Sequence, residues 1–300
     1  MYYVKISFVN GFTTLLESDT LWAYLMYYLN ELGYESEFNK LKEWLENWKI
    51  CFSSAFPVNW KIYFPKPLKK IENREDRNEN VEFDLHWEIL SSFRDYSWKK
   101  KIRKAEYFSQ DFLRRFFDNN FSSVKDEDIL NISNYTWFKI QNNIPRWDYV
   151  ENKEETNVYP VEDIIFWPEW VFFVKSEEDI NDLLEKFKEI FLIFGWWKAK
   201  SRGLGVVRKI EFWLVENEDL KEILKLLSEN NVALSNVYVK DKDKVERVKV
   251  WLKLPTRISK DEKFLDKPIV YVKPGSILDG EGDIKKLENK ILSVKNFSKC

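Results

Sequence analysis

The chain has 300 residues, of which 44% are hydrophobic and 33% are charged, and its formal net charge is -2. This length favours two domains of about 150 residues each, and the apolar content excludes a wholly disordered chain. A net charge so close to zero excludes a protein that attracts nucleic acid over its whole surface, so any such site must be local. No run approaches the 18 or so apolar residues of a membrane helix, and residues 1–8 do not resemble a secretory signal.

Cysteine and histidine are scarce. Cys51 and Cys300 are the only cysteines, and His86 is the only histidine. Two such cysteines provide neither a disulfide framework nor metal-ligand spacing, so we expect a cytoplasmic protein without metal or other cofactor. A lone histidine without a matched nucleophile provides no catalytic set, so we expect no enzymatic activity. The 14 Trp, 14 Tyr and 23 Phe could stack on bases, but core and interface packing is their usual role.

The first third of the chain predicts a strand followed by helices. Residues 2–9 alternate like a strand, and Ser18 is placed to cap a helix that begins at Asp19 and stops at Gly33. The apolar face of this helix comprises Leu21, Leu25, Tyr28, Leu29 and Leu32. A second helix is expected to carry Leu41, Trp44, Leu45 and Trp48. Residues 50–67 are typical of short strands with prolines, and residues 71–83 of an exposed, mobile loop.

The middle of the chain predicts a long insertion and then regular structure. Residues 98–117 have a helical pattern and residues 141–157 are polar, so we expect little sheet in the middle third. Strands are expected within residues 157–175. Ser176 with Asp179 predicts a capping-box start for a helix that carries Ile180, Leu183, Leu184, Phe187 and Ile190. A glycine-bearing loop and a strand at residues 206–215 complete the order strand, helix, strands, helix, strand of a ferredoxin-like unit.

The last third predicts a smaller second unit. A helix with Leu220, Ile223, Leu224 and Leu227 precedes strands at residues 232–239 and 245–254, joined by a hairpin tip at residues 240–244. Further strands are expected at residues 269–272 and 291–294. The predicted fold class is α+β, with two ferredoxin-like (RRM-like) units, antiparallel sheets and a long insertion in the first. We place the units at residues 1–215 and 216–300.

Residues 195–205 read GWWKAKSRGLG and contain three glycines, three cations and no carboxylate. Gly203 and Gly205 permit backbone angles closed to other residues, so successive N–H groups could converge on an anion. The cations that would neutralise its charge are Lys198, Lys200 and Arg202. This pattern predicts a phosphate cradle, and a plain glycine turn with solvated cations is the alternative.

Other basic and aromatic residues give weaker signals. One cation cluster comprises Lys99, Lys100, Lys101, Arg103 and Lys104, and a smaller one Lys66, Lys69 and Lys70. Such runs usually form a solvated face. Trp60, Trp147, Trp196 and Trp197 could stack on bases, although packing inside the protein is more usual.

Several segments, taken in order, resemble the RAMP superfamily of CRISPR proteins, and more narrowly the fourth subunit of type III-A (Csm) complexes. They are Ser18–Leu25, Ser53–Pro57 with Phe64–Pro67, Asn143–Arg146, the glycine-rich residues 195–205, and the Gly-Ser element Tyr271–Ser276. Two departures stand out. Pro145 occupies a position where the family usually has an acidic residue, and Trp196 and Trp197 occupy positions where it has smaller ones.

The resemblance implies a non-catalytic subunit that binds the 5′ handle of the guide RNA (crRNA) between the first helix and the glycine-rich loop. It also implies a heteromeric complex in which the chain links a large polymerase-like subunit to a backbone subunit, away from any membrane. The expected RNA-binding residues are Lys198, Lys200, Ser201, Arg202, Gly203 and Gly205, with Ser18, Lys66, Asn143 and Arg146 as helpers. A metal-independent guide-processing endoribonuclease of the same superfamily is the alternative, and a scaffold that touches no RNA is a third reading.

Overall fold

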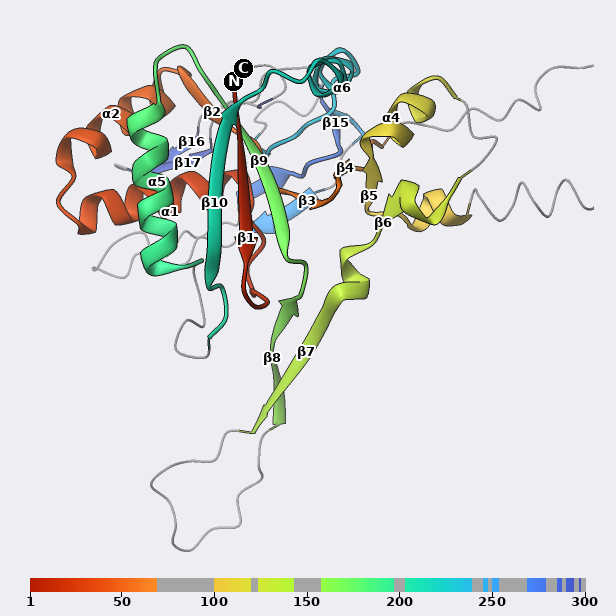
Figure 1. The fold of residues 1–300 in the computed structure, drawn as a ribbon, viewed down its shortest axis with the longest axis horizontal. Coiled ribbons are helices and arrows are strands. Elements are labelled where there is room, and N and C mark those ends of the chain that lie inside the picture. Colours follow the sequence, from red (N-terminus) through yellow and green to blue (C-terminus); the bar gives the residue numbers. More distant parts are fainter. Residues whose placement is uncertain are drawn as a thin grey trace, which may run out of the picture.

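The structure is a computed structural model that describes residues 1–68, 100–119, 124–142, 158–196 and 203–238, together with short pieces of the carboxy-terminal part. Those pieces are residues 245–247, 250–253, 269–278, 285–287, 290–293 and 297. The fold is α+β, and the strand pairs of its named sheets are antiparallel, as the sequence predicts (Figure 1).

The central sheet is built around β1 (Tyr2–Phe8), which pairs with β10 (Val207–Leu214) on one side and with β9 (Glu169–Ser176) on the other. β9 pairs in turn with β2 (Ile50–Phe52) and β3 (Phe56–Asn59). Together with the helices between these strands, this is the predicted ferredoxin-like arrangement.

One face of the sheet is covered by α1 (Ser18–Glu31), α2 (Glu35–Glu46) and α5 (Asn181–Phe194), which Figure 1 shows together on the same side. Side chains alternate along β1, so Val4, Ile6 and Phe8 join the core cluster beneath these helices. Gly33 has φ +75° and ends α1 as predicted, because only glycine adopts this conformation without cost.

Two predicted helix caps are wrong. Glu17 occupies the N-cap position of α1, and the buried Ser18 hydroxyl accepts a hydrogen bond from the Asn236 amide instead. The expected capping box before α5 is also absent, because Ser176 accepts from Glu178 and the helix begins only at Asn181. Local spacing suggested both caps, but tertiary contacts decided where the chain turns.

The opposite face of the sheet carries α4 (Gln110–Phe117) and α6 (Glu218–Glu229). On the β3 side the sheet continues with β4 (Lys61–Pro65) and β5 (Tyr107–Ser109). α6 carries the predicted apolar residues, and the Asn217 side chain caps it by accepting from the Leu220 amide at 3.1 Å. Its leucines pack in the same core cluster as Phe108 and Phe112. This second core therefore joins residues from both sides of the predicted boundary at residue 215.

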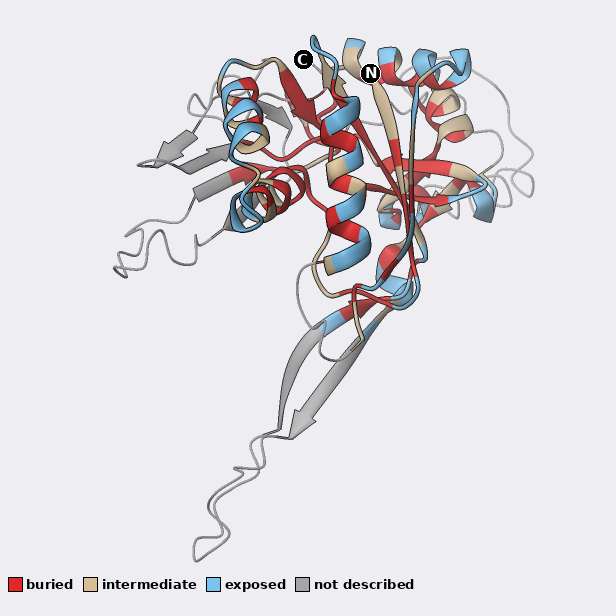
Figure 2. Ribbon diagram, turned by 60° about the vertical axis from the view of Figure 1, so that its left-hand side comes forward, coloured by how far each residue is buried: buried red, intermediate tan, exposed pale blue. Residues whose placement is uncertain are grey.

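The middle third contains more sheet than expected, so that prediction is wrong. β4, β5 and β6 (Ile129–Leu130) extend the central sheet beyond β3. β7 (Thr136–Asn142) and β8 (Val158–Ile165) form a hairpin that extends away from the body (Figure 1). The burial colouring in Figure 2 shows that the root of this hairpin contributes buried residues to the body. β5 has three residues and β6 has two, too few to give a period-2 pattern.

The carboxy-terminal strands are short. β11 (Val237–Tyr238), β14 (Ile269–Val272) and β13 (Val250–Lys253) form a three-stranded sheet. Two-stranded sheets are formed by β12 (Val245–Arg247) with β15 (Ile277–Leu278) and by β16 (Lys285–Leu287) with β17 (Lys290–Ser293). The predicted strand at residues 232–239 is reduced to an isolated bridge at Val232 and β11. The expected loop at residues 71–83 and the hairpin tip at residues 240–244 lie outside the described residues.

Two further expectations concern cysteine and membranes. Cys51 is fully buried in β2 and is disulfide-bonded, whereas the two cysteines of the sequence indicated no disulfide framework. The other cysteine, Cys300, lies outside the described residues, and two distant cysteines give no spacing from which a bond could be predicted. None of the helices in the described part of the chain combines the length and apolarity that a bilayer crossing requires.

Candidate nucleic-acid interface

The glycine-rich segment begins and ends at a closed neck formed by Gly195, Trp196 and Gly205. The Trp196 amide donates to the Gly205 carbonyl at 2.6 Å, and the Gly205 amide donates to the Gly11 carbonyl at 2.9 Å. Gly195 and Gly205 have φ +65° and +70°. A methyl group on Gly195 would lie 2.6 Å from the Gly205 carbonyl oxygen, and one on Gly205 would meet the Trp196 carbonyl. Both positions therefore require glycine, in its conformation and in its size.

Trp196 anchors this neck in the core. Its side chain is 1% exposed, its indole N–H donates to the Thr14 carbonyl, and its ring stacks on Phe191 with centroids 5.4 Å apart. The Tyr24 hydroxyl donates to the Gly195 carbonyl. Burial raises the pKa of Tyr24, and neighbouring Tyr28 raises it further, so the phenol keeps its proton and remains a donor. Trp196 thus has the core role and not the base-stacking one.

The phosphate cradle stays a prediction, although the structure confirms its expected backbone angles and gives one of its amides another partner. Gly203 and Gly205 do adopt left-handed backbone angles, with φ +75° and +70°. The Gly205 amide is bonded to the Gly11 carbonyl, however, so it cannot converge on an anion. The Gly203 carbonyl accepts from the Asn10 side chain at 3.1 Å. The predicted contact residues Lys198, Lys200, Ser201 and Arg202, together with Trp197, lie outside the described residues.

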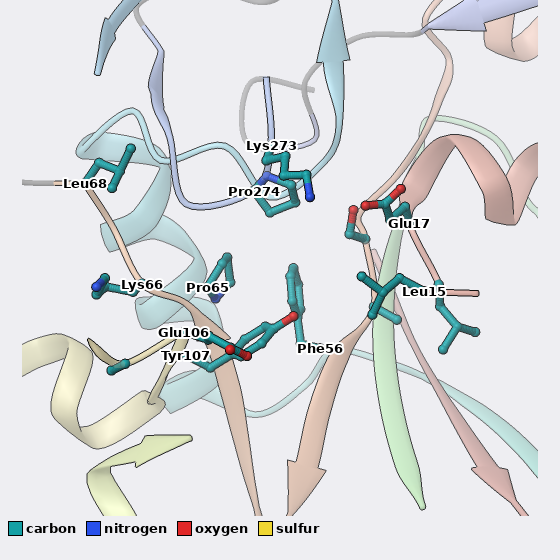
Figure 3. Close-up of a pocket in the computed structure, with 14 residues that line it drawn as sticks. Leu15, Glu17, Phe56, Pro65, Lys66, Leu68, Glu106, Tyr107, Lys273 and Pro274 are labelled. Atoms are coloured by element: carbon teal, nitrogen blue, oxygen red, sulfur yellow. The ribbon is translucent and has the colours of Figure 1, made fainter. Parts of the chain in front are cut away.

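Three of the segments that resemble the RAMP superfamily, Ser53–Pro57, Phe64–Pro67 and Tyr271–Ser276, contribute residues to one pocket. Its volume is about 390 Å³, and Figure 3 shows it. Its walls come from residues 15–17, 54–56, 65–68, 105–107 and 273–274. Backbone hydrogen bonds hold these segments together. The Ala55 amide donates to the Leu16 carbonyl at 2.7 Å, and the Leu68 amide donates to the Gly275 carbonyl at 2.9 Å. The pocket therefore lies where the amino-terminal half of the chain meets the Gly-Ser element.

Lys66 lines this pocket, but its ammonium group is engaged with the protein. It donates to the carbonyls of Ile102 and Arg103 at 3.2 and 2.7 Å, where the helical turn at residues 100–104 ends. Burial lowers the pKa of Lys66, and the nearby Glu106 carboxylate opposes that shift. Lys66 thus holds the pocket wall in place by neutralising the carbonyl end of a turn.

Ser18 lies inside the protein and not on the surface. Its side chain is 1% exposed, its hydroxyl accepts from the Asn236 amide at 2.9 Å, and its own amide donates to the Ser54 hydroxyl at 3.1 Å. Ser18 consequently ties α1 to the carboxy-terminal part. The other predicted helpers, Asn143 and Arg146, lie outside the described residues.

Sequence reasoning missed the residues that form the pocket beside Lys66. Glu106 and Tyr107 lie within residues 98–117, whose sequence has a helical pattern although it contains β5. No sequence pattern therefore indicated that these two residues line a pocket. Lys273 belongs to the Gly-Ser element and could have been found from it. Within the described part of the chain no cluster of His, Cys, Asp and Glu could hold a metal ion. Trp60 is 78% exposed at the turn between β3 and β4, with φ +46°.

These features define an α+β protein with a ferredoxin-like unit and a glycine-rich loop between its last helix and last strand. No family model and no curated protein matches the sequence. Its fold matches a chain of the Csm3-Csm4 subcomplex in the type III-A CRISPR-Cas interference complex, with TM-score 0.60, 16% identity, and coverage of 95% of this chain and 96% of the other.

Two structures of a Csm1-Csm4 cassette match as well. The one in complex with cA4 has TM-score 0.62 and 15% identity, and covers 99% of this chain and 95% of the matched chain. The one in complex with AMPPNP has TM-score 0.60 and 14% identity, and covers 99% and 96%. The α+β fold that the resemblance implies is thereby confirmed, because this chain shares its fold with chains of Csm3-Csm4 and Csm1-Csm4 structures.

Proposed function

We propose that this chain is a non-catalytic RNA-binding subunit of a type III-A CRISPR effector complex, where it holds the 5′ handle of the guide RNA. The observation that carries the proposal is the fold, which matches chains of Csm3-Csm4 and Csm1-Csm4 structures over 95% and 99% of its length. Such coverage includes both halves of the chain and not the ferredoxin-like unit alone. In this proposal the protein partners are a large polymerase-like subunit and a backbone subunit.

The rigid neck of the glycine-rich segment supports RNA binding at this place. Because Trp196 is fixed in the core and Gly205 is bonded to Gly11, the ends of the segment are held in a defined position. Residues 197–202 between them carry three cations and no carboxylate. A cationic segment held at both ends loses less conformational entropy on binding a phosphate chain than a free one does. The sequence between the two ends of the neck therefore concentrates positive charge in a protein of net charge -2.

Replacing Lys198, Lys200 and Arg202 together by Ala tests the proposal. In the complex purified from cells, this variant should retain less guide RNA, because the counterions that each bound phosphate releases drive binding. The slope of log affinity against log salt should become shallower by about 0.7 for each phosphate that the variant no longer neutralises. The measurement is guide RNA per complex, followed by filter binding at several salt concentrations.

A charge-matched control replaces Lys125, Lys221 and Lys225 by Ala, since these three exposed lysines lie on other elements. This control should retain guide RNA as the unaltered chain does. Equal retention by both triple variants, with both correctly assembled, would remove the proposed RNA role. Incubating the complex with repeat RNA in chelator separates out the endoribonuclease alternative, since only a nuclease would cut it at a defined position.

A further inference from the structure

The central sheet ends on one side at a long strand, β10. This strand pairs with β1 on its inner side, and no described strand pairs with its outer side. Figure 1 shows β10 as the outermost strand beside β1 and β9. The other end of the sheet is β6, which has two residues, whereas β10 has eight. An edge strand of that length presents a row of backbone groups that can pair with another chain.

The hydrogen bonds to β1 define which backbone groups of β10 face outward. The Val215 amide donates to the Met1 carbonyl at 3.1 Å, and the register with β1 is regular over residues 210–214. Alternate residues of an antiparallel strand point their N–H and C=O groups toward the same neighbour, so Trp213 and Glu211 also face β1. The residues whose backbone groups point away from the sheet are therefore Ile210, Phe212 and Leu214.

The two halves of β10 differ in how well they are protected against strand pairing. Arg208 and Lys209 in the first half are exposed, and the pairing with β1 is irregular beside them. Charged side chains and bulges are common devices that block an edge. Residues 210–214, which we call the open half, contain no lysine, arginine or proline, and their Trp213 and Leu214 are 47% and 55% exposed. The open half thus offers both backbone groups and apolar side chains.

Apolar side chains flank the open half on both faces of the sheet. Phe212 pairs with Val4, whose side chain joins the core beneath the helices, so Phe212 lies on the helix face. Alternation along the strand places Leu214 on that face too and Trp213 on the other, where its ring centroid lies 5.6 Å from that of Tyr3. A strand added at this edge would find apolar neighbours above and below it.

The chemistry of this edge selects a polypeptide. Each outward residue presents one donor and one acceptor, and another extended backbone matches both. A sugar-phosphate chain has no such alternation. The charges beside the open half are already paired, Glu211 with Lys209 at 2.5 Å and Lys188 with Glu185 at 3.1 Å. The matching segment therefore needs no net charge, and apolar side chains at successive positions suit both faces.

We propose that the open half of β10 is the docking edge for an extended apolar segment of a neighbouring subunit, which adds a strand to the central sheet. This inference rests on the proposed function only in requiring a heteromeric complex, and it does not involve the RNA site. A second copy of this chain matches less well. The Lys188 ammonium lies 5.9 Å from the Phe212 ring, so antiparallel pairing of two copies about Phe212 would bring each Lys188 toward its counterpart.

Hydrogen exchange at single-residue resolution tests the docking edge. The full chain is compared with its binary complexes with the large polymerase-like subunit and with the backbone subunit. In the chain alone, the outward amides of Ile210, Phe212 and Leu214 should exchange fast, whereas those of Glu211 and Trp213 should exchange slowly. In one of the two complexes the outward amides should slow by about 10-fold or more, and the inward ones should change little. Contact through side chains alone would not produce this alternation.

Two substitutions of Leu214, whose side chain is exposed, separate the backbone from the side chain. Leu214→Pro removes an outward donor, and Leu214→Ala removes most of the same side chain but keeps that donor. The proline variant should bind the protecting subunit at least about 10-fold more weakly than the alanine variant. If the proline variant does not fold, Leu214→Lys takes its place, because a lysine at an edge opposes strand pairing.

The outcomes separate this inference from the proposed function. If guide RNA is retained but the three outward amides exchange equally fast in both complexes, the docking edge is overturned and the RNA role stands. If those amides are protected but the triple loop variant retains as much guide RNA as its control, the RNA role fails and the docking edge stands.

Three further results would overturn the docking edge. Slow exchange of the outward amides in the dilute chain would mean that the chain covers its own edge. Protection that rises with the concentration of the chain alone would assign the edge to a second copy. Equal affinities of the proline and alanine variants, or of the lysine and alanine variants, would indicate side-chain contact without an added strand.

Discussion

The loop neck and the pocket are built in different ways. The neck depends on the backbone of three residues close in sequence, Gly195, Trp196 and Gly205, anchored by one buried indole. The pocket depends on five segments that tertiary contacts bring together. The neck should therefore be sensitive to single changes in backbone geometry, whereas the pocket should tolerate the removal of any one polar group. Single substitutions in each region can test this contrast.

Gly205→Ala should destabilise the neck most. Gly205 has φ +70°, and the added methyl group would meet the Trp196 carbonyl, so we expect a loss of at least about 2 kcal/mol in the free energy of unfolding. Urea unfolding measures it.

The control for that change is Gly33→Ala, because Gly33 has φ +75° but no atom within 4 Å of the added methyl position. It carries the conformational cost alone, about 1 kcal/mol. Equal losses of stability for the two variants would show that the approach to the Trp196 carbonyl costs nothing and that the neck is looser than its hydrogen bonds indicate.

Tyr24→Phe should weaken the neck by an intermediate amount. It removes the hydrogen bond from the hydroxyl to the Gly195 carbonyl, and about 1 kcal/mol of stability should go with it. Because the folded state raises the pKa of Tyr24, this tyrosine contributes stability that is present below about pH 10 and lost as the pH rises further. The variant should thus lose stability less steeply than the unaltered chain in an alkaline unfolding series. An identical slope would contradict the assignment.

Lys66→Met should have the smallest effect and reports on the pocket wall. Methionine keeps much of the apolar stem but removes the donor to the Ile102 and Arg103 carbonyls. The free energy of unfolding should fall by about 1 kcal/mol or less, because burying the ammonium group already offsets part of the gain from these hydrogen bonds. Chemical unfolding checks the value. The comparison variant is Lys61→Met. The Lys61 ammonium pairs with Asp111 at 2.6 Å on the surface, so its removal should cost little free energy of unfolding. A larger destabilisation at Lys61 than at Lys66 would reverse this ranking.

Local patterns were sufficient where neighbours in sequence also become neighbours in space. The strand at residues 2–9, the helix end at Gly33 and the apolar face of helix α6 were all predictable, because alternation, left-handed glycine and helical periodicity act within a few residues. The left-handed backbone at Gly203 and Gly205 was predictable for the same reason.

Tertiary structure alone decided where polar groups find their partners. Ser18 bonds to Asn236 rather than capping its own helix, and the Gly205 amide bonds to Gly11 rather than facing an anion. β5 is invisible in sequence because three residues gain strand geometry only from β4 beside them. A hydrogen-bonding group pairs with whichever partner the folded chain brings within reach, and residues far apart in sequence, such as Tyr107 and Lys273, share a pocket only once that chain has folded.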